Sequence, residues 1–272
     1  MSRSKPQIHW RAAGHGPVLV LINGWTASGL AWPAGWVREL QQTYRVVRPD
    51  NRGTGYSRFA DVPFTVGDMA EDIVDVLDDA GAERASVLGL SMGGMIAQEL
   101  AIRAPERVEA LVLAGTRPPD PMCGPRPAPA LMLSLLRPAR RREGLETYFR
   151  RLWTAAVAPG FADREPELMD ELVRQSVDRP APRSLMLHQM RAASGWGRVH
   201  RLARISAPTV VVHGTLDRFV DVRHGHRLVE LIAGAQLLEV PGAGHILPLE
   251  APEALTRALA MARSAKLEAS AA

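Results

Sequence analysis

The pentapeptide Gly89-Leu90-Ser91-Met92-Gly93 most constrains what this chain can fold into, because it joins an apolar run to a helical pattern without a loop. Residues 85–88 are typical of a buried strand, and residues 94–101 are typical of a helix. A serine on so sharp a turn lies in strained backbone, with its hydroxyl exposed above a helix N-terminus. This geometry suits a nucleophile. The alternative is a glycine-rich packing turn whose serine only caps the helix.

Apolar runs and helical patterns alternate along most of the chain, which predicts right-handed crossovers onto a mostly parallel sheet. Strands are expected at residues 7–12, 18–22, 44–48, 85–90, 108–114, 208–213 and 236–240. Helices are expected from a Thr65 cap to Gly81 and over residues 93–104, 228–232 and 252–262. The predicted fold class is therefore α/β, with a doubly wound sheet.

The alternation breaks between residues 117 and 200, where helical patterns follow a proline-rich start and no buried strand is visible. We expect this segment to form a helical lid inserted into a core of residues 1–116 and 201–265. A pocket would then lie between the lid and the strand ends. Residues 266–272 are expected to form a disordered tail.

Composition narrows the classes of function that the chain can have. The single cysteine, Cys123, rules out an intramolecular disulfide. The N-terminus lacks the apolar core of a signal peptide, and no run approaches the length of a membrane span. The 33 Lys and Arg residues are interleaved with 29 Asp and Glu residues, so the net charge of +4 does not indicate a nucleic-acid partner. We expect a soluble cytoplasmic protein with no membrane partner. The sequence leaves its oligomeric state open.

Partners for a serine nucleophile should follow other strands at the same edge of the sheet. A serine hydroxyl needs a base within hydrogen-bond reach and a third group that orients the base. Asp217 follows the predicted strand 208–213, and His245 follows the strand 236–240 through a glycine-lined loop.

Other histidines and acids are weaker candidates for these roles. His213 ends a strand and is expected to be structural, whereas His224 and His226 start a helix and are expected to be exposed. Asp221 is the alternative acid, although its place at a helix start favours a capping role.

The chain order Ser91, Asp217, His245 and five short motifs resemble the α/β-hydrolase fold superfamily. The motifs lie at residues 21–25, 50–57, 89–94, 213–217 and 242–245, so the resemblance covers nearly all of the chain outside the lid. It implies that Ser91 is the nucleophile, that His245 is the base and that Asp217 orients it. It also implies an oxyanion hole made by the backbone N–H groups of Trp25 and Met92. The chain departs from the pattern at Asn23, where similar proteins most often carry histidine.

The expected pocket wall is apolar, which favours a hydrophobic substrate. Its candidate residues are Trp25, Met95, Trp153, Trp196, Phe219 and Ile246; the alternative for the lid residues among them is that they pack on one another. The sequence thus predicts hydrolysis of a carboxylic ester or lactone through an acyl-enzyme on Ser91. Carbon–carbon bond hydrolysis of a ring-cleavage-type diketone, and a non-hydrolytic ligand-binding or biosynthetic role, stay open. No metal-ligand or dinucleotide motif is present, so no metal or cofactor is expected.

Overall fold

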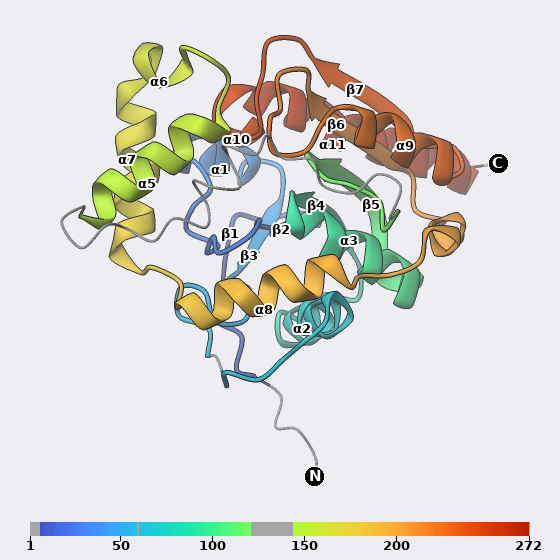
Figure 1. The fold of residues 1–272 in the computed structure, drawn as a ribbon. Helices are drawn as coiled ribbons and strands as arrows, with labels where there is room; N and C mark the ends of the chain where they lie inside the picture. Colours follow the sequence, from blue (N-terminus) through green and yellow to red (C-terminus); the bar gives the residue numbers. More distant parts are fainter. Residues whose placement is uncertain (1–5, 59, 121–143, 272) are drawn as a thin grey trace.

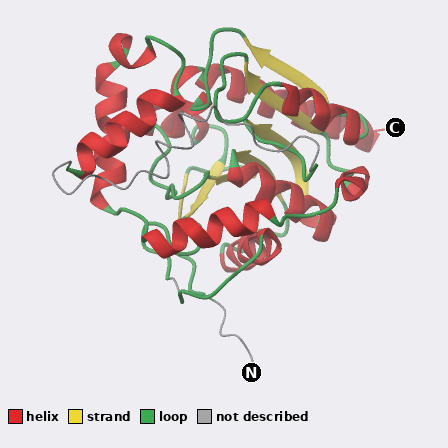
Figure 2. Ribbon diagram, viewed as in Figure 1, coloured by secondary structure: helices red, strands yellow, loops and turns green. Residues whose placement is uncertain are grey.

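The fold is built around a seven-stranded sheet, and the computed structural model describes residues 6–58, 60–120 and 144–271 of the chain. The strand order is β1-β3-β2-β4-β5-β6-β7; β1 pairs antiparallel with β3, and the other pairs are parallel. Figure 2 shows the strands at the centre, between helices. The strands are β1 Trp10–Ala13, β2 Val18–Ile22, β3 Arg45–Pro49, β4 Ala85–Leu90, β5 Val108–Ala114, β6 Thr209–Gly214 and β7 Gln236–Val240. The predicted α/β class is confirmed.

The central strands are apolar on both faces because helices cover both faces. Successive side chains of a strand point to opposite sides. In β2, Val20 and Ile22 join the core on one face, whereas Leu19 and Leu21 join the core on the other. All four side chains are fully buried.

The helices that flank the sheet divide between its two faces (Figure 1). One face is covered by α2 (Val66–Asp79), α3 (Met92–Arg103) and α9 (Arg223–Leu231), and the other by α1 (Ala34–Leu40) and α11 (Pro252–Ala271). Two short helices, η1 (Pro105–Arg107) and α10 (Leu247–Glu250), complete this part. As predicted, Thr65 caps α2: its hydroxyl accepts a hydrogen bond from the Asp68 N–H, and the Asp68 carboxylate accepts one from the Thr65 N–H.

Helices also fill the described chain between β5 and β6. They are α5 (Leu145–Ala156), α6 (Phe161–Arg164), α7 (Pro166–Asp178), α8 (Arg183–Ser194) and the 3-10 helix η3 (Val199–Arg204). In Figure 1, α5, α6 and α7 gather on one side, whereas α8 runs beside α2 and α3, where its Leu185 joins their core. Residues 121–143 of the expected lid, with Cys123, lie outside the described residues.

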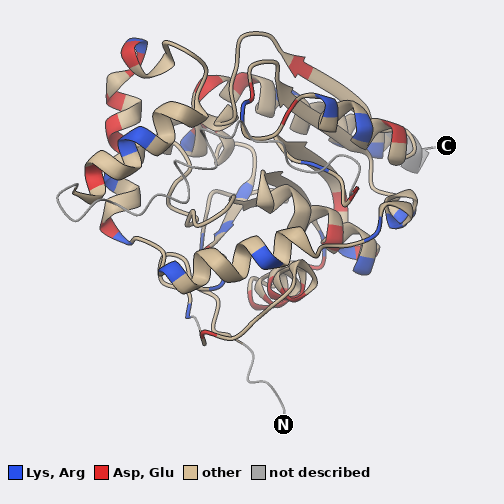
Figure 3. Ribbon diagram, in the orientation of Figure 1, with Lys and Arg blue, Asp and Glu red and all other residues tan. Residues whose placement is uncertain are grey.

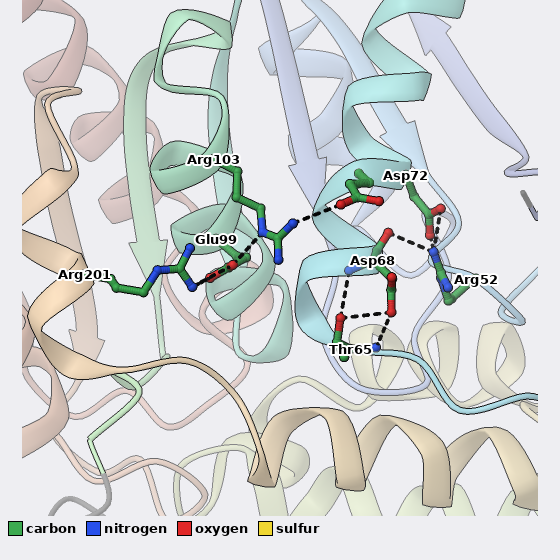
Figure 4. Close-up of polar contacts among 8 residues, drawn as sticks. Arg52, Thr65, Asp68, Asp72, Glu99, Arg103 and Arg201 are labelled. Carbon is green, nitrogen blue, oxygen red and sulfur yellow. Dashed lines mark hydrogen bonds and ion pairs between the residues drawn. The ribbon is translucent and has the colours of Figure 1, made fainter. Parts of the chain in front are cut away.

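Ion pairs on two buried carboxylates, Glu99 and Asp72, link neighbouring segments of the fold (Figure 4). The Glu99 carboxylate on α3 accepts hydrogen bonds from Arg103 at 2.7 Å and from Arg201 of η3 at 3.0 Å. Arg52 donates two hydrogen bonds, of 2.7 and 2.8 Å, to the Asp72 carboxylate on α2. Elsewhere basic and acidic residues are both spread over the ribbon (Figure 3). Among the described residues, no helix combines the length and apolarity that crossing a bilayer requires.

Some predicted boundaries differ from the structure. The strand predicted at 7–12 is found at Trp10–Ala13. The helix predicted at 228–232, with His224 and His226 at its start, runs from Arg223 to Leu231, and the Asp221 carboxylate accepts a hydrogen bond from the Arg223 N–H at 2.9 Å. The tail predicted to be disordered is instead the end of α11, which continues to Ala271. Residues 263–271 contain good helix formers and neither glycine nor proline, so the helix has no local reason to stop.

The turn between β4 and α3 lies directly against the end of β2, backbone on backbone. A Cβ atom added to Gly93 would overlap the carbonyl oxygen of Ile22 and come within 2.7 Å of the carbonyl oxygen of Asn23. A Cβ atom on Gly89 would overlap the carbonyl group of Gly93. Both glycines of the pentapeptide are therefore required by close approach.

Gly93→Ala should lower the free energy of unfolding by about 3 kcal/mol or more, because backbone must shift to admit the methyl group. The control is Gly35→Ala in α1, where an added Cβ meets no atom within 4 Å. It should raise stability by about 0.5–1 kcal/mol. Urea unfolding of both variants measures the difference, and equal effects would contradict the close approach.

Candidate active site

Ser91 has the strained backbone that the pentapeptide predicted. Its φ is 55° and its ψ is −118°, a conformation that costs a non-glycine residue about 1–3 kcal/mol. Its N–H donates to the carbonyl of Ala114 at 2.9 Å, and the Thr116 hydroxyl donates to the Ser91 carbonyl at 2.6 Å. The Ser91 side chain makes no capping hydrogen bond to α3. The alternative in which Ser91 is only a helix cap is therefore not realised.

His245 and Asp217 meet although 28 residues separate them. The loop after β7 carries His245 and the loop after β6 carries Asp217, and the distance from His245 Nδ1 to Asp217 Oδ2 is 2.7 Å. The imidazole is nearly buried and the carboxylate fully so. The ring of Phe219 stacks on the imidazole, with 5.1 Å between ring centroids and 14° between planes.

The Asp217 carboxylate is held in its ionised form. Burial by itself would raise the pKa of Asp217, but the charges and hydrogen bonds of His245 and His213 outweigh it and hold this pKa well below its usual range. The other carboxylate oxygen, Oδ1, accepts hydrogen bonds from the Phe219 and Val220 N–H groups, each at 2.8 Å. An ionised, fixed carboxylate can orient an imidazole and stabilise its cation.

The competing histidines take other places. His213 is fully buried, with Nε2 at 2.7 Å from the carbonyl oxygen of Val220 and at 3.5 Å from Asp217 Oδ2, so it lies behind the carboxylate. The prediction that His224 is exposed was wrong, because α9 packs its first turn against β6 and buries the ring. His226 is exposed, with Nε2 at 3.1 Å from a Glu239 carboxylate oxygen.

The loop expected to form an oxyanion hole lies against Ser91. A Cβ atom added to Gly24 would be 3.2 Å from Ser91 Cβ and 3.8 Å from Ser91 Oγ. The side chain of Asn23 shapes this loop, since it accepts a hydrogen bond from the Gly24 N–H at 2.8 Å and donates one to the Ser28 carbonyl at 3.0 Å. The asparagine thus bonds to the loop. Trp25 lies in this loop after β2, and Met92 is the first residue of α3.

A chamber of about 80 Å³, called the inner chamber below, contains both Ser91 and His245 in its wall. Four of the six predicted wall residues line it: Trp25, Trp153, Phe219 and Ile246. Met95 and Trp196 do not; both are buried in the core between α3 and its neighbours, where the Trp196 indole N–H lies 3.4 Å from the Glu99 carboxylate. Amphipathic patterns do not distinguish a core residue from a pocket residue, so these two predictions were wrong.

Glu250 is a residue of the site region that the sequence reading missed. Its Oε2 accepts hydrogen bonds from the Gly244 and Ala158 N–H groups, each at 2.8 Å, and its Oε1 accepts one from Ile246 at 3.0 Å. Burial raises the pKa of Glu250, and the three N–H groups oppose that rise. The position, five residues after His245 in an apolar run, is the signal that could have drawn attention to it.

A metal centre is not built by the described residues, among which no group of three or more His, Cys, Asp or Glu side chains is arranged to hold a metal ion. The arrangement is instead that of a strained serine, an oriented histidine and a buried carboxylate at one edge of a sheet.

Known proteins resemble this chain over most of its length. A family model described as alpha/beta hydrolase fold matches residues 17–252. Rhodomycin D methylesterase DauP of Streptomyces sp. (strain C5) is 30% identical over 269 residues, covering 89% of each chain. 2-Hydroxymuconate semialdehyde hydrolase of Pseudomonas sp. (strain CF600) is 32% identical over 252 residues, covering 88% of this chain and 83% of the relative. The solved enol-lactonase from Burkholderia xenovorans LB400 superposes with a TM-score of 0.79 at 25% identity, covering 95% of this chain and 97% of that one.

Asp217→Asn should destabilise the protein in a pH-dependent way. Because the pKa of Asp217 is depressed in the folded state, its ionised form stabilises the fold above the unfolded-state pKa of about 3.9, and this contribution is lost as pH falls through the folded-state pKa. We expect a loss of about 2 kcal/mol or more at pH 7, shrinking below about pH 4. Urea unfolding across this range measures it.

The control for that measurement is Asp221→Asn. Its carboxylate is exposed and pairs with Arg223 in solvent, where screening reduces the effect to within about 1 kcal/mol at any pH. A pH-independent difference between wild type and Asp217→Asn would contradict the ionised carboxylate.

Proposed function

The chain belongs to the α/β-hydrolase fold family, and from this premise we propose that it is a serine hydrolase that cleaves a carboxylic ester or lactone of a hydrophobic small molecule. The observation that carries the proposal is the 2.7 Å contact between His245 and the buried Asp217 in a chamber whose wall also holds the strained Ser91. Relatives of the chain include a methylesterase and an enol-lactonase, which supports an acyl-transfer reaction.

In the proposed reaction, Ser91 Oγ attacks the carbonyl carbon of the ester while His245 takes the hydroxyl proton. Asp217 fixes the tautomer of His245 and stabilises the imidazolium that forms. The tetrahedral intermediate collapses when its bond to the leaving alcohol breaks, and His245 returns the proton to that alcohol. Water then attacks the acyl-enzyme with His245 as base, releasing the acid and restoring Ser91.

The proposed oxyanion hole consists of the backbone N–H groups of Trp25 and Met92. Met92 is the first residue of α3, so its N–H has no carbonyl partner within the helix. Trp25 follows the glycine that contacts Ser91, in the loop bonded by Asn23. The loss of one such donor typically costs about 10² to 10³ in rate.

We further propose that residues 117–200 act as a lid over a core of residues 1–116 and 201–265. Support comes from the described helices α5 and α7, whose Leu152, Trp153 and Leu172 line the inner chamber opposite the residues of the sheet edge. The apolar character of this wall favours a hydrophobic substrate.

A second candidate reaction is hydrolysis of a carbon–carbon bond, which uses the same three groups. The relative named 2-hydroxymuconate semialdehyde hydrolase favours it. In ester hydrolysis His245 protonates the oxygen of the leaving alkoxide, whereas in carbon–carbon bond hydrolysis the leaving atom that must be protonated is a carbon. Tests with the two kinds of substrate therefore separate the reactions.

An active-site fluorophosphonate probe should label the protein at Ser91, and Ser91→Ala should abolish labelling. Asp217→Asn should slow hydrolysis by about 10³ to 10⁴-fold, because the imidazole takes the wrong tautomer. Mass spectrometry of the labelled peptide locates the adduct, and initial rates measure the loss. A protein that stays unlabelled yet binds a hydrophobic ligand would instead be a non-hydrolytic member of the family.

A panel of p-nitrophenyl esters, lactones and vinylogous diketones then decides the reaction type. Turnover of esters or lactones at rates at least about 10-fold above those of diketones is expected. The reverse order would favour the carbon–carbon hydrolase.

A further inference from the structure

A second and larger cavity adjoins the inner chamber. Its volume is about 320 Å³, against about 80 Å³ for the inner chamber, and we call it the outer chamber. The two chambers share the wall residues Trp25, Ala27, Ala31, Leu152 and Trp153. They are therefore neighbouring compartments under the helices α5, α7 and α8.

The described wall of the outer chamber is rich in flat and adaptable apolar side chains. Four aromatic residues, Trp25, Tyr148, Phe149 and Trp153, face it together with methionines of α8. Such a wall binds planar ring systems by stacking and by sulfur–aromatic contacts. Its other apolar residues include Leu145 and Leu187, which are 44% and 54% exposed, so the cavity has an apolar edge open to solvent.

Hydrogen bonds fix Trp25 and Trp153, the two tryptophans that line both chambers and form the partition between them. The Trp25 indole N–H donates to the carbonyl of Met186 at 3.3 Å, and the Trp153 indole N–H donates to the Ser176 hydroxyl at 2.9 Å. The fully buried Gln189 accepts a hydrogen bond from the Thr26 N–H at 2.9 Å. Both tryptophans are thus anchored, and the difference in size between the chambers is built into the fold.

The position of His245 orients an ester across this partition. His245 lines the inner chamber and not the outer one, and it must protonate the leaving alcohol. The leaving alcohol therefore lies in the inner chamber, whose volume is about 80 Å³, against about 320 Å³ for the outer chamber. The smaller chamber suits the smaller part of the ester, so we assign it a small alcohol and place the acyl part past the tryptophans.

We infer that the natural substrate is an ester of a small alcohol whose acyl part carries a flat aromatic ring system bound in the outer chamber. This inference rests on the proposed function and adds the division of the substrate between the two chambers.

Two isomeric esters test the orientation: methyl 2-naphthylacetate and 2-naphthylmethyl acetate. Both release an alkyl alcohol, so their intrinsic reactivities are similar, but the ring lies on the acyl side in the first and on the alcohol side in the second. We expect kcat/KM to be at least about 10-fold higher for the first. A preference for the second, or labelling at Ser91 without turnover of either isomer, would overturn the inference. Absence of labelling would instead overturn the proposed function.

Two substitutions that fill the outer chamber locate the ring. Ala181→Trp and Met190→Trp should each lower, by about 10-fold, the ratio of kcat/KM for methyl 2-naphthylacetate to that for methyl acetate, mainly through KM. The control is Val62→Trp, at an exposed position on neither chamber, which should leave the ratio unchanged. An unchanged ratio in both filling variants, with melting temperatures like that of wild type, would place the ring elsewhere.

A separate observation concerns Glu250, which bonds to the backbone on both sides of His245. Its carboxylate accepts the N–H groups of Gly244 and Ile246 and also that of Ala158, just after α5. The His245 N–H in turn donates to the carbonyl of Ala156 at 2.9 Å. We propose that Glu250 is a positioning residue that holds the His245 loop in place and ties it to the end of α5.

Glu250→Gln tests this role, because the amide has one acceptor oxygen and would direct an NH₂ group at a backbone N–H. We expect kcat and the rate of fluorophosphonate labelling to fall together by about 10-fold or more, with a smaller change in KM. The matched control is Glu99→Gln, an equally conservative change of a buried carboxylate remote from the chambers. It should lower the melting temperature without lowering kcat. An equal loss of kcat in both variants would mean that Glu250 is structural only.

Discussion

The structure depends on one tight packing contact, between the turn that joins β4 to α3 and the end of β2. Gly93 packs so tightly on the carbonyl of Ile22 that no side chain fits between them. This contact brings the Asn23–Gly24 turn to Ser91. The helix α3 begins at Met92, directly after Ser91. The strained φ of Ser91 persists because the hydrogen bonds to Ala114 and from Thr116 fix its backbone on both sides.

The surroundings of Asp217 and Glu250 set the pKa of each carboxyl group near His245. Asp217 stays ionised because two histidines and two backbone N–H groups face its oxygens, whereas burial raises the pKa of Glu250 in spite of three N–H donors. The two carboxylates act on different parts of His245: Asp217 contacts the imidazole, and Glu250 contacts the loop that carries it. Through Ala156 and Ala158, the same loop is bonded to the helical segment above the inner chamber.

Much of the fold and of the candidate site could be predicted because local patterns encode them. The strands β2, β4, β5 and β7 begin and end at the predicted residues. In β2, β4 and β5 the reason is burial on both faces, which makes the strand sequence mostly apolar. Asp217 and His245 were found because parallel strands bring their carboxyl ends to one edge. Met95, Trp196 and His224 were assigned wrongly, because whether such a side chain faces a chamber, a core or solvent depends on how helices pack, and no local pattern records that packing.

The sequence by itself determined the α/β class, the sharp turn at Ser91 and the order of the three polar residues, because glycine spacing and apolar periodicity are local properties. Only the tertiary structure decided which tryptophans line a chamber, that Glu250 holds the His245 loop, and that a small and a large chamber meet at Trp25 and Trp153. These features join residues from distant parts of the chain, and their geometry follows from the packing of α5, α7 and α8 over the sheet edge, which periodicity does not specify.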